Sequence, residues 1–235
     1  MVNRIFLDIE TTGLTNLDNE LIVVGVLDRD GCKSLWELDD LIEYLDEQKE
    51  KNLPNEIITY NGGTFYNSGF DMPFLRAKLL QASKSNPFMG FSHLDLYPIV
   101  QKYFNFQETV YEKPSVSSLR KADLVKLAEA NEVEYETISK TYETLCEIDE
   151  TDWLDYKTYK TESKNDLQSI YQTFFDVYNS KKYINGSEIP KLYKEGDLET
   201  IEQHVLDDVN QLKQIYFKLR DYVPDNIFNK VREVM

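Results

Sequence analysis

The chain has 235 residues, of which 41% are hydrophobic and 13% aromatic, and its formal net charge is −16. This composition suits one globular domain with a substantial core, and no apolar run approaches the roughly 18 residues that a membrane span requires. Because a protein that grips long nucleic acid usually presents a basic face, the charge argues against a high-affinity, non-specific duplex binder. A solvated acidic surface explains most of these charges equally well.

The sequence contains only two cysteines, Cys32 and Cys146, which form no CxxC pair. We expect both to be reduced, unpaired packing residues, as in a cytoplasmic protein. The first residues lack the basic, then apolar, then small-residue pattern of a secretory signal. The expected localisation is therefore cytoplasmic, with no membrane partner.

Hydrophobic alternation and turn residues predict a mixed α/β domain in the first hundred residues. The expected strands are 3–10, 20–28, 33–38, 55–61 and 91–97. The expected helices are 39–51, 70–82 and 98–104. Three strands joined by short turns and followed by alternating helices and strands predict a sheet that is antiparallel at first and parallel afterwards.

The pattern changes at about residues 106–186, where Glu, Lys, Thr, Ser and Tyr dominate and helical spacing recurs at 118–131 and 166–179. We interpret this region as a mainly helical insertion packed on one edge of the sheet, within a single domain that spans 1–235. An amphipathic helix is expected at 197–219. At about 100° per residue, its apolar stripe consists of Ile201, Val205, Val209, Leu212, Tyr216 and Leu219.

The first expected strand carries two carboxylates, Asp8 and Glu10, on the face opposite to Ile5, Leu7 and Ile9. Two neighbouring carboxylates repel each other strongly in a dry site, unless they share a proton or bind a cation. Divalent cations such as Mg²⁺ take oxygen ligands of this kind. The alternative is that both carboxylates lie in water at an edge or end of the strand.

The closing helix supplies a second set of candidates. Asp208 lies within the apolar stripe, whereas Asp207 points away from it, and His204 lies one turn before Asp208. Asp208 therefore needs compensation for its charge, while His204 alone is equally consistent with a hydrogen-bonded, half-buried histidine. Asp71 can serve as the N-cap of the helix expected at 70–82.

Three segments resemble the exonuclease motifs of the DEDD superfamily of 3′–5′ exonucleases, which have a ribonuclease H-like fold. They are "FLDIETTGL" (6–14), "GFDMPFLRAKL" (69–79) and "EQHVLDDVNQL" (202–212). Together with "IPKLYKEGDLETIE" (189–202), the third is most similar to a bacterial and archaeal branch of predicted ribonuclease H-like exonucleases. The resemblance covers about 3–104 and 187–219, and it implies a mixed five-stranded sheet flanked by helices.

The resemblance implies a divalent-metal-dependent 3′–5′ exonuclease that hydrolyses phosphodiester bonds at single-stranded DNA or RNA ends and releases nucleoside 5′-monophosphates. Two cations, Mg²⁺ or Mn²⁺, would be ligated by Asp8, Glu10, Asp71 and Asp208. His204 would orient or deprotonate the attacking water. This histidine lies four residues before the aspartate, where the superfamily's tyrosine subgroup has its tyrosine, whereas the histidine subgroup places its histidine five residues before.

The resemblance also implies the residues that contact the substrate: Thr11, Gly13, Leu14, Asn61 and Phe70. Asn67 competes with Asn61 for its role, because "GTFYNSG" (63–69) inserts residues before the second motif. Phe65 and Tyr66 could stack on a terminal base. The acidic charge suggests that the substrate enters end-first.

Two alternatives to an exonuclease remain. The chain could be a catalytically inactive nucleic-acid-binding or scaffold domain, or another ribonuclease H-like nuclease such as a hybrid-cleaving endonuclease. In "SHLDL", His93 and Asp95 share one strand face, and they could serve as structural hydrogen-bonding residues or act directly in catalysis.

Overall fold

The structure is a computed structural model that describes residues 2–51, 53–63, 69–112, 116–147, 158–163, 166–175 and 184–235. The chain divides into two compact units. The first unit consists of Met1–Phe106 and Lys164–Met235, and the second of Gln107–Ser163. The organisation as a single domain with an insertion at 106–186 stays a prediction.

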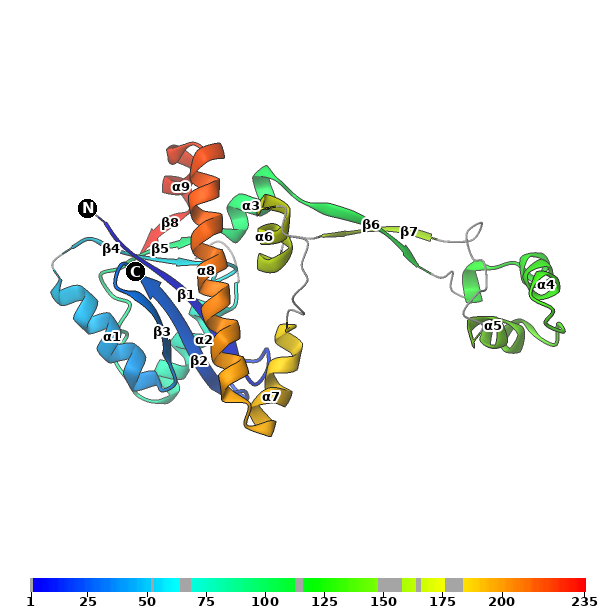
Figure 1. The fold of residues 1–235 in the computed structure, drawn as a ribbon, viewed down its shortest axis with the longest axis horizontal. Coiled ribbons are helices and arrows are strands. Elements are labelled where there is room, and N and C mark those ends of the chain that lie inside the picture. Colours follow the sequence, from blue (N-terminus) through cyan, green and yellow to red (C-terminus); the bar gives the residue numbers. More distant parts are fainter. Residues whose placement is uncertain are drawn as a thin grey trace. The chain divides into compact units, whose positions relative to one another are not determined.

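The first unit is built on a mixed sheet with the strand order β3-β2-β1-β4-β5-β8 (Figure 1). Its strands are β1 Asn3–Thr11, β2 Leu21–Asp28, β3 Gly31–Leu35, β4 Asn55–Thr59, β5 Ser92–Asp95 and β8 Arg232–Val234. β1, β2 and β3 are antiparallel neighbours, whereas β1, β4 and β5 are parallel. The expected α/β class and strand directions are confirmed.

The sheet has a sixth strand that the sequence analysis did not predict. β8 is three residues long and pairs antiparallel with β5 at the sheet edge. A strand this short carries no recognisable alternation, because it spans less than two periods of the strand pattern. The sheet therefore has six strands where five were expected, and the additional one is the edge strand β8.

Seven α-helices of the described residues belong to the first unit. They are α1 Leu38–Glu50, α2 Asp71–Gln81, α3 Tyr97–Tyr103, α6 Leu167–Phe175, α7 Ile189–Glu195, α8 Leu198–Tyr222 and α9 Asp225–Val231. The α8 helix begins where Asp197 Oδ1 accepts a hydrogen bond from the Thr200 N–H at 3.2 Å, which satisfies one otherwise unpaired donor. Every residue of its predicted apolar stripe is buried.

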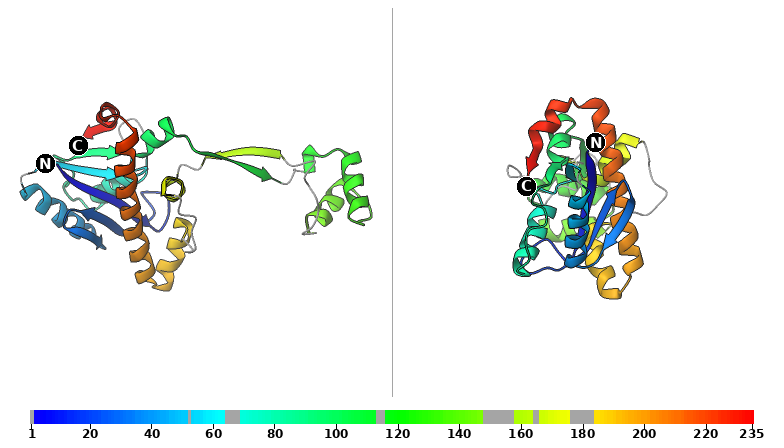
Figure 2. Two further views of the ribbon diagram at one scale, coloured as in Figure 1. Left: turned by 45° about the horizontal axis from the view of Figure 1, so that its top comes forward. Right: turned by 90° about the vertical axis from the view of Figure 1, so that its left-hand side faces the viewer.

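Helices cover both faces of the sheet, as the right-hand view of Figure 2 shows. On one face, Ile5, Leu7 and Ile9 of β1 pack in a cluster with side chains of α1 and α2. On the other face, Phe6 packs in a cluster with side chains of α3, α6 and α8. The predicted alternation of β1 is confirmed, and it directs the side chains of Asp8 and Glu10 to the face covered by α8.

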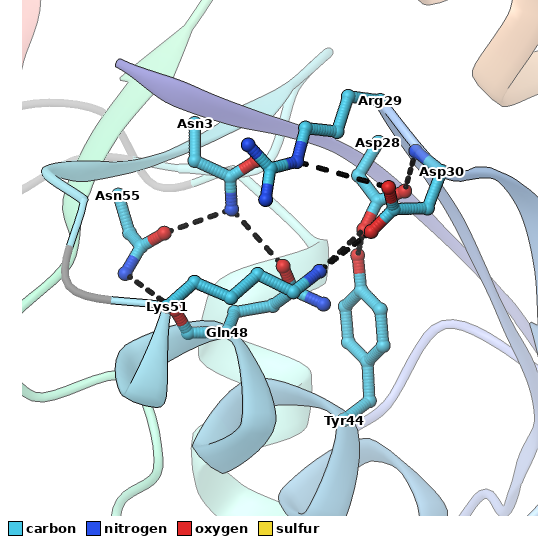
Figure 3. A network of polar contacts seen from close by, with 8 residues as sticks. All are labelled: Asn3, Asp28, Arg29, Asp30, Tyr44, Gln48, Lys51 and Asn55. Carbon is cyan, nitrogen blue, oxygen red and sulfur yellow. Dashed lines mark hydrogen bonds and ion pairs between the residues drawn. The ribbon is translucent and has the colours of Figure 1, made fainter. Parts of the chain in front are cut away.

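A buried polar network holds the amino-terminal end of β1 in place (Figure 3). Asn3 Nδ2 donates hydrogen bonds to Gln48 Oε1 of α1 at 3.0 Å and to Asn55 Oδ1 of β4 at 2.9 Å. In the same network, the Tyr44 hydroxyl donates to Asp28 Oδ2 at 2.9 Å. Because buried polar groups are costly unless hydrogen-bonded, these bonds fix how β1, β4 and α1 meet.

The second unit contains a two-stranded antiparallel ladder of β6 Gln107–Glu112 and β7 Thr158–Ser163, together with η1 Val116–Ser118, α4 Lys121–Ala130 and α5 Ile138–Glu147. Its helices share a cluster of Leu119, Leu124, Leu127 and Leu145. The ladder differs from the mainly helical region expected there. Its strands pair across more than forty residues of sequence, and local periodicity does not reveal such pairings.

Cys32 is exposed and Cys146 is half-buried, and neither forms a disulfide among the described residues. The expected absence of a disulfide between them agrees with the described residues, but Cys32 was wrongly expected to pack in the interior. Across the described ranges, the helices lack the length and hydrophobicity that crossing a lipid bilayer would require.

Candidate active site

A close approach of α8 to the sheet creates the candidate site. Asp8 of β1 lies opposite Gly25 of β2 in the antiparallel register. A Cβ at Gly25 would lie 2.7 Å from Val205 Cγ2 and 2.9 Å from the Val205 carbonyl oxygen of α8. The absence of a side chain at Gly25 of β2 therefore allows α8 to lie close to the sheet beside β1, the strand that carries Asp8 and Glu10.

This approach brings three candidate residues together. His204 Nε2 lies 3.1 Å from Glu10 Oε1 and 3.6 Å from Asp208 Oδ2. One possible ligand atom from each of these residues lies within 4.8 Å of the others. The i, i+4 spacing on α8 thus directs His204 and Asp208 toward the same strand, as the sequence predicts.

Asp71 reaches this site from the amino-terminal end of α2. The interpretation of Asp71 as an N-cap was wrong, because Asp71 is the first residue of the helix, Phe70 occupies the cap position, and no side chain caps the helix. The Asp71 side chain is buried, and its Oδ2 has no hydrogen-bond partner among the described residues. Since an unpaired buried carboxylate oxygen is costly, Asp71 needs a bound cation or a proton.

The pKa values show that these acids share one electrostatic site. Burial raises the pKa of Asp8 well above its ordinary value, and the negative charges of Asp71, Asp208 and Glu10 raise it further. Burial also raises the pKa of Asp71, with contributions from Asp95 and Glu10. Asp8 and Asp71 thus add their charges to the cluster of Glu10, His204 and Asp208, although they are not part of its 4.8 Å group.

His204 partly compensates for these carboxylates. Burial opposes its protonation, but the hydrogen bond to Glu10 and the charges of Asp208, Glu10 and Asp207 together raise the pKa of His204 above its ordinary value. Burial raises the pKa of Asp208 to about 7, although His204 opposes this shift. A single imidazolium cannot neutralise four acids, so the donor set of carboxylate oxygens fits a divalent cation.

Three of the expected substrate residues lie at the end of β1 and in the turn after it: Thr11 is the last residue of the strand, and Gly13 and Leu14 follow. The Thr11 hydroxyl donates a hydrogen bond to the Gly13 carbonyl oxygen at 2.7 Å. A side chain at Gly13 would collide with Asn19, which lies 2.6 Å from the position of its Cβ. Leu14 is 86% exposed. The turn thus presents an apolar side chain to solvent just beyond the acids of β1.

The other expected substrate residues flank the chain between β4 and α2. Asn61 has a φ of 61°, and its carbonyl oxygen accepts a hydrogen bond from the Phe70 N–H at 2.6 Å. The Phe70 ring lies 5.3 Å from the ring of Phe74. Asn67, Phe65 and Tyr66 lie outside the described residues.

His93 and Asp95 are both buried and engaged in hydrogen bonds. His93 Nε2 lies 2.9 Å from Thr59 Oγ1, and Asp95 accepts backbone N–H groups from three residues. These contacts support structural roles rather than direct catalysis. Gly25 is a residue of this site that the sequence analysis missed, although a glycine inside the apolar run "LIVVGVLD" signals a close approach of another backbone.

Comparison with solved structures finds distantly similar chains. One of them is an exonuclease I, described in work on its processivity, which is 11% identical to this chain with a TM-score of 0.34. The match covers 98% of this chain and 76% of that one. E. coli exonuclease I in complex with a dT13 oligonucleotide is also 11% identical with a TM-score of 0.34, covering 98% and 77%. Similarity this low does not bear on the activity of this chain.

No curated protein has significant sequence similarity to this chain. The family model described as RNase_H superfamily, in contrast, matches residues 5–124. That match includes the acids of β1, strands β2 to β5 and Asp71. The chain therefore belongs to the ribonuclease H superfamily.

Proposed function

We propose that this protein is a divalent-metal-dependent 3′–5′ exonuclease that acts on single-stranded DNA or RNA ends and releases nucleoside 5′-monophosphates. Membership of the ribonuclease H superfamily supports a nuclease. The resemblance of the three motifs to DEDD exonucleases supports the 3′–5′ direction. The observation that carries the proposal is the convergence of Glu10, His204 and Asp208 beside half-buried Asp8 and buried Asp71.

The residues of the site divide into two roles. Asp8, Glu10, Asp71 and Asp208 would hold two cations, Mg²⁺ or Mn²⁺, through their carboxylate oxygens. Bound there, the cations would activate the attacking water and stabilise the leaving oxygen of an in-line displacement. Asp71 Oδ2, buried without a partner among the described residues, is the oxygen whose environment most clearly requires such a ligand.

His204 would handle the proton of the attacking water. Its Nε2 faces Glu10 and Asp208 at 3.1 and 3.6 Å, so a proton on this atom is stabilised by both carboxylates. A histidine whose pKa is near the working pH is suited to accept a proton and release it again. We assign to His204 Nε2 the role of proton acceptor.

The turn after β1 and the turn after β4 would receive the 3′-terminal nucleotide. Leu14 offers an exposed apolar side chain for the terminal base or sugar, and Thr11 and Gly13 hold that turn in shape. Asn61 and Phe70 would complete the pocket. The net charge of −16 favours a substrate that approaches end-first, because an extended acidic surface repels phosphates.

The first experiment measures thermal unfolding of the protein in EDTA and in millimolar Mn²⁺ or Mg²⁺. Ligands that bind only the native state stabilise it by about 2.7 kcal/mol at one hundred times Kd. For a chain of this length, that corresponds to roughly 5–11 °C in Tm. No shift in Tm at millimolar metal would refute metal-dependent catalysis and would favour a scaffold domain that binds no cations.

The second experiment determines the direction of cleavage. A single-stranded oligonucleotide labelled at its 5′ end should shorten stepwise from its 3′ end, whereas a 3′ label should appear at once as a mononucleotide. Products that arise by internal cuts before the 3′ end shortens would instead identify an endonuclease. Matched DNA and RNA strands in the same assay measure the preference for sugar type.

A further inference from the structure

Asp95 is a buried acid that the proposed function does not use. It is the last residue of β5, is 0% exposed, and lies beside Thr59 of β4 in the parallel register. Its Oδ1 accepts hydrogen bonds from the N–H groups of Asn61 at 2.8 Å and Tyr97 at 3.0 Å, and its Oδ2 accepts one from Gly63 at 3.0 Å. Asp95 forms no ion pair within the described ranges, so these backbone donors stabilise its charge.

Two of these donors belong to the turn that follows β4. Asn61 and Gly63 have φ angles of 61° and 82°. Glycine adopts such an angle at little cost, and asparagine tolerates it better than most residues. A side chain at Gly62, between them, would collide with the side chain of Thr59. Asp95 thus holds, through two backbone hydrogen bonds, a tight turn whose left-handed positions are filled by residues that tolerate them.

The same turn holds the amino-terminal end of α2. The Asn61 carbonyl oxygen accepts a hydrogen bond from the Phe70 N–H at 2.6 Å, and the Gly62 carbonyl oxygen accepts one from the Met72 N–H at 2.9 Å. Phe70 and Met72 are the two neighbours of Asp71. A continuous set of hydrogen bonds therefore joins the Asp95 carboxylate to the backbone on both sides of Asp71.

Asp71 depends on this backbone support for its position. Its Oδ2 has no hydrogen-bond partner within the described part of the chain, and its side chain does not cap α2. Its carboxylate orientation is thus set by the turn and by packing rather than by hydrogen bonds of its own. Removing a group that orients a metal ligand without binding the metal itself commonly lowers metal affinity.

We propose that Asp95 is a positioning residue, which holds the turn of residues 61–63 and through it places Asp71 in the metal site. This inference rests on the proposed function. Asp95 is not assigned as a ligand in this scheme, because it is not part of the close group of Glu10, His204 and Asp208.

The test compares Mn²⁺ binding by the wild type and by Asp95→Asn, measured by calorimetry with the metal alone. An amide oxygen in the place of Oδ1 can still accept from Asn61 and Tyr97, but an amide nitrogen in the place of Oδ2 cannot accept from Gly63. We expect Mn²⁺ affinity to fall about 10- to 100-fold. The exonuclease kcat should recover at saturating Mn²⁺, with an unchanged KM for the oligonucleotide.

Asp28→Asn is the matched control. Asp28 is also a buried carboxylate that holds a turn, since it accepts hydrogen bonds from the Asp30 N–H at 2.7 Å and the Tyr44 hydroxyl at 2.9 Å (Figure 3). Asp28→Asn should lower Tm in EDTA but leave Mn²⁺ affinity within about twofold of the wild type. If both variants lose affinity equally, the effect is a general loss of structure and the inference is wrong.

The remaining outcomes are also decisive. Wild-type Mn²⁺ affinity in a folded Asp95→Asn would overturn the inference while leaving the proposed function intact. Absence of Mn²⁺ binding by the wild type would refute the proposed function and this inference together. If Asp95→Asn does not fold, Gly62→Ala is the second variant, because its Cβ would collide with the Thr59 side chain and displace the same turn without changing Asp95. Reduced Mn²⁺ affinity in Gly62→Ala supports the inference, and unchanged affinity overturns it.

Discussion

The substitution Gly25→Ala tests whether the close approach of α8 to β2 creates the active site. The added Cβ would lie 2.9 Å from the Val205 carbonyl oxygen, whereas ordinary van der Waals contact begins at 3.4 Å. Because this neighbour is backbone, α8 itself must move, by roughly 0.5–1 Å if the gap opens to ordinary contact. His204 and Asp208 lie on the same turns of α8 as Val205 and would move with it.

The magnitudes follow from this displacement. Overpacking of a close-packed interior costs about 1–3 kcal/mol, and the entropic gain from replacing glycine offsets about 0.4–1 kcal/mol of it. A net loss of about 1–2 kcal/mol lowers the Tm of a chain this long by roughly 2–8 °C. Catalysis should fall more steeply, by about 10²-fold, since a 1 Å misplacement of catalytic groups has an effect of this size.

The assay combines thermal unfolding in EDTA with the degradation rate of a 5′-labelled oligonucleotide at saturating Mn²⁺. Gly186→Ala is the control, because a Cβ at Gly186 would meet no atom within 4 Å and the backbone there is not left-handed. The control should match the wild type in both measurements. Wild-type turnover in Gly25→Ala would refute the reasoning, since the site would then not depend on the separation between α8 and β2.

Three further predictions concern individual side chains. Asp8→Asn should raise Tm in EDTA, because burial and the charges of Asp71, Asp208 and Glu10 disfavour the ionised carboxyl. The variant should also lose the Mn²⁺-dependent rise in Tm. A lower Tm than that of the wild type in EDTA would contradict this prediction. Burial, with the charge of Arg76, lowers the pKa of His93 from 6.5 to about 4, so the unfolded chain binds the extra proton between these values. As pH falls from 7 to 4, the wild type should therefore lose about 3 kcal/mol more unfolding free energy than His93→Gln does, measured by urea titration at each pH. Equal losses in the two proteins would count against a buried neutral His93. Leu14→Ala should raise KM for the oligonucleotide roughly five- to tenfold through loss of apolar contact, with Mn²⁺ affinity unchanged; an unchanged KM would remove Leu14 from the substrate pocket.

The local pattern of residues was sufficient to predict much of the site. Strand alternation directed Asp8 and Glu10 to the face opposite Ile5 and Leu7, and the helical spacing of His204 and Asp208 directed both side chains the same way. Both predictions succeeded because side-chain direction follows the regular geometry of a single element. The same argument explains why the apolar stripe of α8 and the α/β class were predicted correctly.

Other features depended on contacts between distant parts of the chain. Gly25 meets Val205 across 180 residues, and the short β8 strand becomes recognisable only through its pairing with β5. Asp71 was expected to be an N-cap but instead has a buried oxygen without a partner among the described residues. Its position likewise depends on how the turn after β4 meets α2.

The amino-acid sequence by itself thus indicated the candidate residues of the site and which way they point from their own strand or helix. Only the tertiary structure decided that β1, α2 and α8 bring these side chains near one another, that Asp95 accepts hydrogen bonds from the turn before α2, and that Gly25 meets α8. The physical reason is that periodicity records the burial of each element, whereas the distance between two elements depends on the size and the hydrogen bonds of the residues at their contact.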